Sequence, residues 1–292
     1  MRIVVFGRSL GDDRASSVSN LFRLLAGWST RIQVYEPFWG VIQSVLPDNL
    51  PIEPYLNPSE IRGADVMVTL GGDGTLLEAV THVGASGIPL LGINTGRLGF
   101  LTAYSGEELP DAAELFRASL AKTEARMLLE LKTSPNPFEP FPFALNELTV
   151  HKRDTSSMIS IQVKRNQKML NTYWADGLII STPTGSTGYS LSCGGPILLP
   201  DVPNLVLTPI APHNLNVRPL VISSNDHLLV RAEARGRAKI MISLDSRSEP
   251  VAAVQELSIQ KADFNIQLVR RSDHDFLDTL REKLMWGNDK RN

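Results

Sequence analysis

Residues 69–76 read Thr69-Leu70-Gly71-Gly72-Asp73-Gly74-Thr75-Leu76 and join an apolar run to a segment with helical spacing. The apolar run, 66–70, is typical of a buried parallel strand, and apolar residues one helical turn apart follow Thr75. Glycines at such a junction let the backbone approach a ligand closely, and the free N–H groups of the next helix suit phosphate. The stretch therefore predicts a strand, a tight turn and a helix, with a ligand bound at the turn.

Asp73 is the carboxylate of this turn, and it would repel a bound phosphate unless it had another task. Accepting a proton or holding a metal ion would be such a task. Asp73 could instead be a helix cap in an ordinary tight turn, because aspartate is common at that position. The doubled glycine and the polar segments downstream favour the first interpretation.

The residues around this turn alternate between strand-like and helix-like patterns. Strands are expected at 3–6, 31–35, 66–70 and 89–93, and helices at 18–25, from Leu76 onward and at 109–120. Residues 47–60 contain four prolines and are expected to form a loop. The alternation predicts an open, parallel α/β sheet, in which ligands gather beyond the carboxyl ends of the strands.

After Ala125 the pattern changes to short segments, several of which alternate apolar and polar residues. They are 127–133, 143–150, 158–165, 178–181, 205–208, 220–223, 227–233, 239–244, 256–260 and 265–270. Such a succession predicts an all-β domain, a sandwich or stacked sheets, with Asn166-Gln167 as a hairpin turn. Helical spacing returns at 273–286. We therefore expect an α/β domain at 1–124, a β-rich domain at 125–271 and a C-terminal helix within 272–292.

Composition and charge exclude several classes of protein. The chain has 292 residues, enough for about two domains. Its 29 Lys and Arg residues nearly balance 31 Asp and Glu residues, which argues against nucleic acid as the main partner. Cys193, the single cysteine, excludes an intrachain disulfide. No apolar run reaches the length of a membrane span. We expect a soluble, cytoplasmic protein that binds neither membranes nor nucleic acid.

A second polar segment reads Ser181-Thr182-Pro183-Thr184-Gly185-Ser186-Thr187-Gly188-Tyr189-Ser190 and follows Asp176-Gly177 and a strand. Its hydroxyl groups and glycines can bind sugar hydroxyls, a base edge or phosphate. It could also be a solvent-exposed loop, but its position between two apolar strands argues against that.

Two further groups of polar residues are candidates. Asn146-Glu147 interrupts the strand-like run 143–150 and could simply face solvent. Asn94, Arg97 and Phe100 follow another strand end, where they could line the same crevice as Asp73. Arg97 would suit a phosphate there, although a surface arginine is the plainer interpretation.

Other common sites are missing from the sequence. No G-x-x-x-x-G-K-[ST] motif occurs, and no G-x-G-x-x-G follows a strand. The five histidines show no metal-ligand spacing, and no histidine motif accompanies Cys193.

Taken together, the motifs resemble those of the NAD kinase family, in the expected order over nearly the whole chain. The matching residues are Gly71-Gly72-Asp73-Gly74-Thr75, Gly92-Ile93-Asn94, Leu98-Gly99-Phe100-Leu101, Asn146-Glu147, Asp176-Gly177, Thr182-Pro183-Thr184-Gly185-Ser186-Thr187 and Tyr189. The G-G-D-G-T motif is shared with lipid kinases and related phosphofructokinases, whereas the T-P-T-G-S-T-x-Y segment downstream of N-E is far more specific.

The resemblance implies a Rossmann-like N-terminal domain, a β-rich C-terminal domain and a C-terminal helix that returns to the first. It implies transfer of the terminal phosphoryl group of ATP, or in some members polyphosphate, to the adenosine ribose 2′-hydroxyl of NAD. Magnesium would accompany the donor. Asp73 would be the catalytic base, because a ribose hydroxyl is a poor nucleophile. Gly72, Gly74 and Thr75 would offer donors to phosphate.

The resemblance also implies binding roles for residues of the β-rich domain. Asn146 and Glu147 would contact the dinucleotide, and the segment containing Thr184, Thr187, Gly188 and Tyr189 would surround its adenosine end. Asp176 would contact the nicotinamide amide from a neighbouring subunit, with Ala211 near it. The site would then be shared within a homo-oligomer, a dimer or a tetramer.

Three positions depart from the family pattern. Gly188 stands where most members have alanine, and Arg97 replaces a common histidine. Asp245-Ser246-Arg247 replaces a frequent Asp-Gly-Gln, so no role is transferred to it. Two other functions remain open: a related kinase acting on a lipid or sugar, and a catalytically silent NAD(P)-binding sensor.

Overall fold

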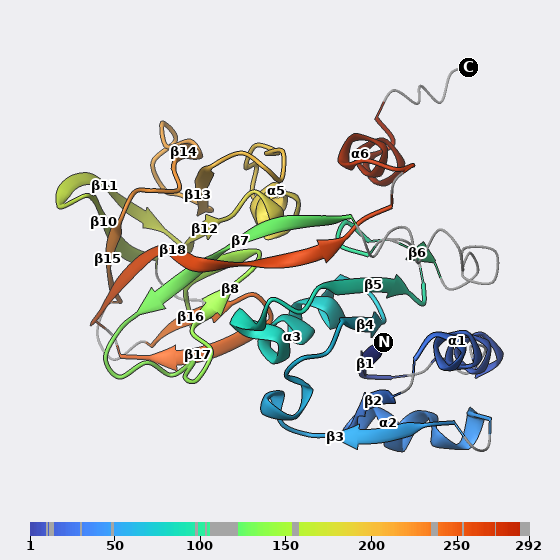
Figure 1. Ribbon diagram of the computed structural model, residues 1–292. Coiled ribbons are helices and arrows are strands. Elements are labelled where there is room, and N and C mark those ends of the chain that lie inside the picture. Colours follow the sequence, from blue (N-terminus) through green and yellow to red (C-terminus); the bar gives the residue numbers. More distant parts are fainter. Residues whose placement is uncertain are drawn as a thin grey trace. The chain divides into compact units, whose positions relative to one another are not determined.

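The computed structural model describes residues 1–9, 11, 15–29, 31–47, 50–96, 99–102, 104–105, 122–153, 158–234, 239–252, 254–271 and 273–286 (Figure 1). The chain forms two compact units. Unit 1 comprises Met1–Ala125 and Ile266–Asn292, and unit 2 comprises Arg126–Asn265. The domain boundaries expected from the sequence, at 124/125 and 271/272, stay a prediction.

Unit 1 is built on a parallel sheet with the strand order β5-β4-β1-β2-β3. Its strands are β1 Arg2–Gly7, β2 Arg31–Tyr35, β3 Ile52–Tyr55, β4 Val66–Leu70 and β5 Leu90–Asn94. The free side of β5 pairs in parallel with β6 (Tyr104–Ser105) and with Leu268 near the end of β18 (Val254–Val269). The predicted α/β class is confirmed.

The expected loop at 47–60 was wrong in part, because β3 lies inside it. Pro54 is one of its residues and is paired in register with Val34. Proline cannot donate to a neighbouring strand, but β3 is an edge strand of the sheet, where a missing donor is tolerated. The prolines of this segment are therefore compatible with an edge strand and did not indicate a loop throughout.

Helices cover both faces of this sheet. The covering helices are α1 Ala15–Trp28, α2 Glu36–Ile42 and α3 Asp73–Val83. The unit also contains α6 Phe276–Leu284 and short 3₁₀ segments at Gln43–Val45, Pro58–Ile61 and Gly84–Ser86. Buried residues of α1 and α2 join one core with Val5 of β1. His82 of α3 instead contacts Phe6, with ring centroids 4.8 Å apart. Since successive strand residues point to opposite faces, α3 covers the other face. The helix expected at 109–120 lies outside the described residues.

Unit 2 contains two antiparallel sheets. The first has the order β14-β13-β12-β9-β16-β17, and the second contains β11-β10-β15-β18, with β7 pairing with β18 and β8. The bounds are β7 Thr123–Lys132, β8 Phe143–Ala144, β9 Glu147–Lys152, β10 Ile159–Arg165, β11 Lys168–Ala175, β12 Gly177–Ser181, β13 Asn204–Ile210, β14 Leu220–Ser223, β15 Leu228–Glu233, β16 Ile240–Leu244 and β17 Arg247–Val251. A 3₁₀ turn, Thr184–Thr187, and the short helix α5, Tyr189–Ser192, follow β12.

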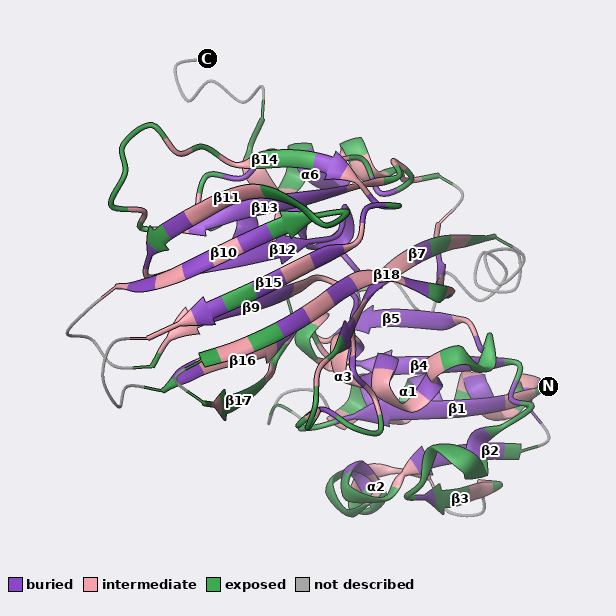
Figure 2. Ribbon diagram, turned by 90° about the vertical axis from the view of Figure 1, so that its left-hand side faces the viewer, coloured by how far each residue is buried: buried purple, intermediate pink, exposed green. Residues whose placement is uncertain are grey.

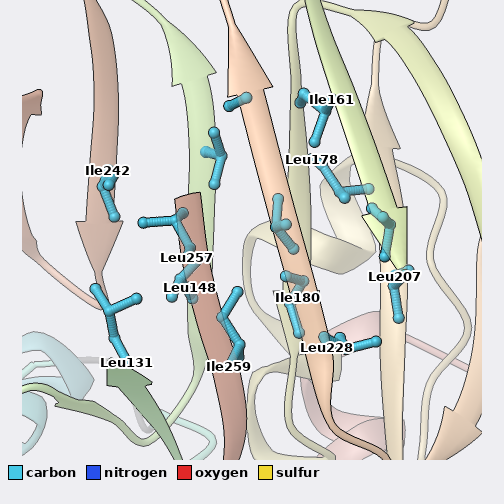
Figure 3. Close-up of a cluster of buried hydrophobic side chains, with 14 of the residues drawn as sticks. Leu131, Leu148, Ile161, Leu178, Ile180, Leu207, Leu228, Ile242, Leu257 and Ile259 are labelled. Atoms are coloured by element: carbon cyan, nitrogen blue, oxygen red, sulfur yellow. The ribbon is translucent and has the colours of Figure 1, made fainter. Parts of the chain in front are cut away.

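The two sheets of unit 2 pack face to face and form its core. Leu148, Leu178 and Ile180 of the first sheet lie among Ile161, Leu228, Leu257 and Ile259 of the second (Figure 3). Along β10 and β15 buried residues alternate with more exposed ones (Figure 2). This is the period of a strand with one buried face, and it confirms the predicted sandwich-like domain.

The hairpin predicted at Asn166-Gln167 is confirmed. Arg165 pairs with Lys168, and the two residues between them have φ of 49° and 68°. Positive φ at both central residues is the backbone of a type I′ turn, which suits the twist of the strands. None of the described helices is long and apolar enough to cross a membrane.

Candidate active site

The glycine-rich turn of unit 1 has a backbone that only glycine suits at its first position. Gly71 has φ of +151°, and a Cβ atom there would lie 2.8 Å from Cβ of Thr75. Its N–H donates to the carbonyl of Ile93 on the neighbouring strand at 3.0 Å. Around Gly72 and Gly74, in contrast, an added Cβ atom would meet nothing within 4 Å. This open space lets a ligand approach the backbone closely.

Asp73 does not act as the helix cap. The N-cap residue of α3 is Gly72, and Asp73 is the first residue of the helix itself. Its carboxylate accepts two backbone hydrogen bonds from a loop that is distant in sequence. Phe100 N–H donates to Oδ2 at 2.8 Å, and Leu101 N–H donates to Oδ1 at 3.1 Å. A side chain at Gly99 would overlap this carboxylate. The structure therefore joins the G-G-D-G-T and L-G-F-L motifs.

Asn94 supports the same loop from inside. It is only 4% exposed, and its Oδ1 accepts the N–H of Gly96 at 2.6 Å. Oγ1 of Thr102 accepts the N–H of Gly99 at 2.9 Å and the side-chain amide of Asn94 at 3.4 Å. Asn94 thus shapes the loop that contacts Asp73. Arg97 lies outside the described residues.

In unit 2, Asn146 does not lie within a strand as expected. It lies in the bend between β8 and β9, and Glu147 is the first residue of β9. Asp245 holds this bend, because its carboxylate accepts the N–H groups of Leu145 at 2.8 Å, Asn146 at 2.8 Å and Glu147 at 3.1 Å. Burial raises the pKa of the Asp245 carboxyl, although these three N–H groups act in the opposite direction.

The turn that presents Asp245 also holds the chain just before the bend. Asp245 and Ser246 join β16 to β17, and Asp245 has φ of 53°. Arg247 donates to the carbonyl groups of Phe141, at 2.6 Å, and Phe143. Its guanidinium also lies 5.4 Å from the ring centroid of Phe141. Asp245-Ser246-Arg247, to which the sequence assigned no role, therefore positions Asn146 and Glu147.

Asn146 and Glu147 each carry a buried polar atom with no partner among the described residues. These atoms are Oδ1 of Asn146 and Oε2 of Glu147. Burial raises the pKa of Glu147 to about 8, and the nearby Asp245 carboxylate adds to the shift. A carboxyl with this pKa is mostly protonated at neutral pH and can donate a hydrogen bond. Buried polar atoms without partners are rare in folded proteins and suit the binding of a polar ligand.

The hydroxyl-rich segment packs directly against this bend. Thr182 donates through its N–H to the carbonyl of Asn146 at 2.9 Å, and through Oγ1 to the carbonyl of Leu145 at 2.6 Å. A Cβ atom on Gly188 would lie 3.1 Å from Oε2 of Glu147. The structure therefore brings together the N-E and T-P-T-G-S-T motifs, which lie more than thirty residues apart.

A cavity of about 320 Å³ in unit 2 has Glu147, Asp176 and Tyr189 among its lining residues, together with His151, Lys152 and Asp245. Tyr189 is 47% exposed, so its ring is available to a ligand. Asp176 lies between β11 and β12, and its Oδ1 pairs with Lys152 Nζ at 2.7 Å. Ala211, directly after β13, is exposed and is not part of this lining.

Thr184 and Thr187 lie on the 3₁₀ turn after β12. Thr184 is buried, and its Oγ1 accepts a hydrogen bond from Nη1 of Arg126 at 3.2 Å. Because arginine can only donate, the hydroxyl hydrogen of Thr184 is left for another acceptor. Arg126 is itself 1% exposed. Sequence reasoning missed Arg126 because nothing in its strand-like surroundings distinguishes it from a solvent-facing arginine.

Across the part of the chain that the structure describes, no group of three or more His, Cys, Asp or Glu side chains could hold a metal ion. Asp73 offers one carboxylate whose two oxygens each accept one N–H. A single carboxylate fits the way magnesium is usually held beside nucleotides, where substrate phosphates and water supply most of the ligands.

Two family models match this chain. The ATP-NAD kinase N-terminal domain matches residues 4–122, and the ATP-NAD kinase C-terminal domain matches residues 145–271. The NAD kinase of Bacteroides fragilis is 42% identical over 291 residues, and that of Cytophaga hutchinsonii is 41% identical over 296 residues. Both matches cover 100% of both chains.

Two solved structures have the same fold. Yeast NADH kinase complexed with NADH matches with a TM-score of 0.87 at 24% identity, over 99% of this chain and 89% of the other. An NAD kinase from Archaeoglobus fulgidus in complex with ATP matches with a TM-score of 0.73 at 26% identity, over 98% and 99%. At 24% identity the yeast match is evidence for the fold alone.

Proposed function

This chain belongs to the ATP-NAD kinase family, and we propose that it transfers the terminal phosphoryl group of ATP to the adenosine ribose 2′-hydroxyl of NAD, giving NADP and ADP. The observation that carries the chemistry is the Asp73 carboxylate. It lies at the carboxyl end of β4 beside an open glycine turn, and two backbone N–H groups hold it. This is the edge of an α/β sheet at which ligands bind.

Asp73 is the general base in this proposal. The 2′-hydroxyl loses its proton to the carboxylate as its oxygen attacks the γ-phosphorus, while the bond from phosphorus to the β,γ-bridging oxygen breaks and ADP leaves. Proton acceptance by a positioned group contributes about a hundredfold to ten-thousandfold to such a step. The N–H groups of Phe100 and Leu101 keep the carboxylate in one orientation, which favours the reacting geometry.

The turn Gly72–Thr75 is the proposed contact for the triphosphate, through backbone N–H groups at the start of α3. Phe100 on the neighbouring loop is a further proposed contact, and so is Arg97, which lies outside the described residues. Magnesium would be held mainly by the phosphate oxygens, with Asp73 as the carboxylate available nearby, and it would neutralise charge on the transferring group.

The NAD-binding residues are proposed in unit 2. Asn146 and Glu147 present the unpartnered polar atoms, and Thr184, Thr187, Gly188 and Tyr189 surround the adenosine end. The hydroxyl hydrogen of Thr184 suits a ring nitrogen of adenine, because Arg126 donates to the hydroxyl oxygen and leaves the hydrogen for an acceptor. Asp176 and Ala211 are proposed for the nicotinamide amide of NAD bound to a neighbouring subunit.

A homo-oligomer follows from that last assignment. Its support is the edge strand β11, on which Met169 is 57% and Trp174 51% exposed. Large apolar side chains on a sheet edge are unusual for a monomer and suit pairing between chains. The proposed location is the cytoplasm.

An assay of the purified chain with NAD, ATP and magnesium, scored by NADP formation, tests this function. We expect NADP, and none after a chelator removes magnesium. Phosphorylation of diacylglycerol or fructose 6-phosphate without any of NAD would instead identify the related lipid or sugar kinase. NAD binding without NADP formation under all donor conditions would identify the silent sensor.

A further inference from the structure

Arg270 contacts the loop that holds Asp73. Its guanidinium donates from Nη1 and Nη2 to the carbonyl oxygen of Phe100, at 3.3 and 3.4 Å. Asp73, Phe100 and Arg270 all belong to unit 1, although Arg270 comes 170 residues after Phe100. No motif marks Arg270 in the sequence.

The contact matters because of the peptide group it involves. The carbonyl of Phe100 and the N–H of Leu101 belong to the same peptide unit, and that N–H donates to Oδ1 of Asp73. A cation on the carbonyl side polarises the peptide and strengthens the hydrogen bond on the N–H side, as in other hydrogen-bonded chains. A guanidinium, a peptide group and the Asp73 carboxylate thus form one continuous chain.

Arg270 is itself held in place. Nε donates to Oε2 of Glu124 at 2.9 Å, and the backbone N–H of Arg270 donates to the carbonyl of Lys122 at 3.1 Å. The side chains of Arg270 and Glu124 are 18% and 32% exposed, so solvent screens the pair only in part. Glu124 fixes one edge of the guanidinium, and the other edge reaches Phe100.

We propose that Arg270 is a positioning residue for the phosphoryl transfer: through the peptide of Phe100 and Leu101 it holds the Asp73 carboxylate in the orientation that accepts the proton. This rests on the proposed role of Asp73. A substrate-binding role would change the KM for NAD or ATP, whereas a positioning role changes kcat, because the orientation of the base matters only in the reacting complex.

The test compares Arg270→Gln, Arg270→Lys and Glu124→Gln with a matched control, Arg31→Gln. Arg31 also donates from Nε to a glutamate Oε2 at 2.9 Å, that of Glu53, so the control removes a similar ion pair from unit 1. We expect kcat of Arg270→Gln to fall by about 10- to 100-fold, the effect of a small misplacement of a reacting group. Both KM values should stay within about twofold. Arg270→Lys should recover part of kcat, Glu124→Gln should lose less, and Arg31→Gln should match wild type.

A double-mutant cycle with Asp73→Asn separates positioning from general loss of structure. If Arg270 acts through Asp73, adding Arg270→Gln to Asp73→Asn should lower kcat by less than about twofold more. If Arg270→Gln lowers kcat equally in the wild-type and Asp73→Asn backgrounds, the proposal is overturned. It is also overturned if Arg270→Gln alone has wild-type kcat. If Arg270→Gln does not fold, Glu124→Gln decides in the same cycle. Full turnover by Asp73→Asn itself would overturn the proposed base, whereas an inactive Asp73→Asn beside a fully active Arg270→Gln overturns the positioning role alone.

Discussion

Gly185 lies so close to Asn146 that a Cβ atom on the glycine would overlap the carbonyl oxygen of the asparagine. The same carbonyl accepts the N–H of Thr182, so the hydroxyl-rich segment and the N-E bend are held as one body. Gly188, three residues later, meets the bend less closely, with 3.1 Å from its hypothetical Cβ to Oε2 of Glu147 and 3.6 Å to Nδ2 of Asn146.

Gly185→Ala and Gly188→Ala should therefore differ. Gly185→Ala forces the backbone of residue 185 away from that of Asn146. We expect a loss of about 1–3 kcal/mol in unfolding free energy together with a raised KM for NAD. The second has a negative φ of −92°, and its Cβ atom would meet the Glu147 carboxyl group at 3.1 Å and the carbonyl oxygen of Gly185 at 3.2 Å, so both groups need to shift only slightly. Its unfolding free energy should stay within about 0.5 kcal/mol of wild type, as for ordinary tolerated substitutions. Urea unfolding and steady-state kinetics measure both, and equal behaviour of the two variants would contradict the packing described for Gly185.

Asp73→Asn preserves the size of the side chain and removes its charge and its ability to accept the proton. We expect kcat to fall by about a hundredfold to ten-thousandfold, with a much smaller change in NAD affinity. The fold should survive, because the amide oxygen of asparagine can still accept one of the two N–H groups from the loop. Lost binding with unchanged kcat at saturation would make Asp73 a binding group only, and an unfolded variant would make it a structural one.

Glu147 should give the stability of the protein a pH dependence. Its pKa is raised from 4.5 to about 8 in the folded chain, mainly by burial, so between these values the folded state holds a proton that the unfolded state releases. This contribution to stability is complete below pH 4.5, is lost as pH rises toward 8, and stays lost above it. Glu147→Gln has no such proton. The Tm of the variant should rise relative to wild type between pH 5 and pH 8, and at about pH 9 the difference should have levelled off. A difference in Tm that stays constant with pH would show that the pKa of Glu147 is not raised.

Asp245 should be needed for the shape of the proposed NAD site, because its carboxylate holds the bend that carries Asn146 and Glu147. Asp245→Ala leaves three N–H groups of residues 145–147 without their acceptor, and each buried unsatisfied donor costs about 1–3 kcal/mol. We expect a lower unfolding free energy and a raised KM for NAD. Ser246→Ala, at the exposed neighbour in the same turn, is the control and should change neither. If Asp245→Ala folds and its KM for NAD is unaltered, the turn at Asp245 does not contribute to NAD binding.

Asp176 tests the shared site. Its substitution by alanine removes the proposed acceptor for the nicotinamide amide and the Oδ1 that pairs with Lys152 Nζ. We expect a raised KM for NAD, and for the wild-type chain a specific activity that falls when dilution dissociates the oligomer. Full activity from a chain shown to be monomeric at the assay concentration would contradict the assignment across subunits.

Several local features follow from the sequence because they depend on neighbouring residues only. The apolar run 66–70, the glycines after it and the Asn166-Gln167 turn all have the expected backbone, since strand period, positive φ and turn type are set within a few residues. Pro54 and Asn146 were wrongly placed for the opposite reason. Whether a proline lies in an edge strand, or a polar pair in a bend, depends on which strands become neighbours.

The sequence by itself therefore determined the two classes of fold, the order of the motifs and the identity of the Asp73 turn, through periodicity and residue chemistry. Only the tertiary structure decided which groups support the motifs. Asp245 reaches the N-E bend from about a hundred residues away, and Arg270 reaches the loop of Asp73 from 170. Hydrogen bonds of this kind leave no periodic pattern in the chain, because they depend on where distant backbone groups come to lie after folding. For the same reason, the raised pKa of Glu147 is a property of its burial and not of its neighbours in sequence.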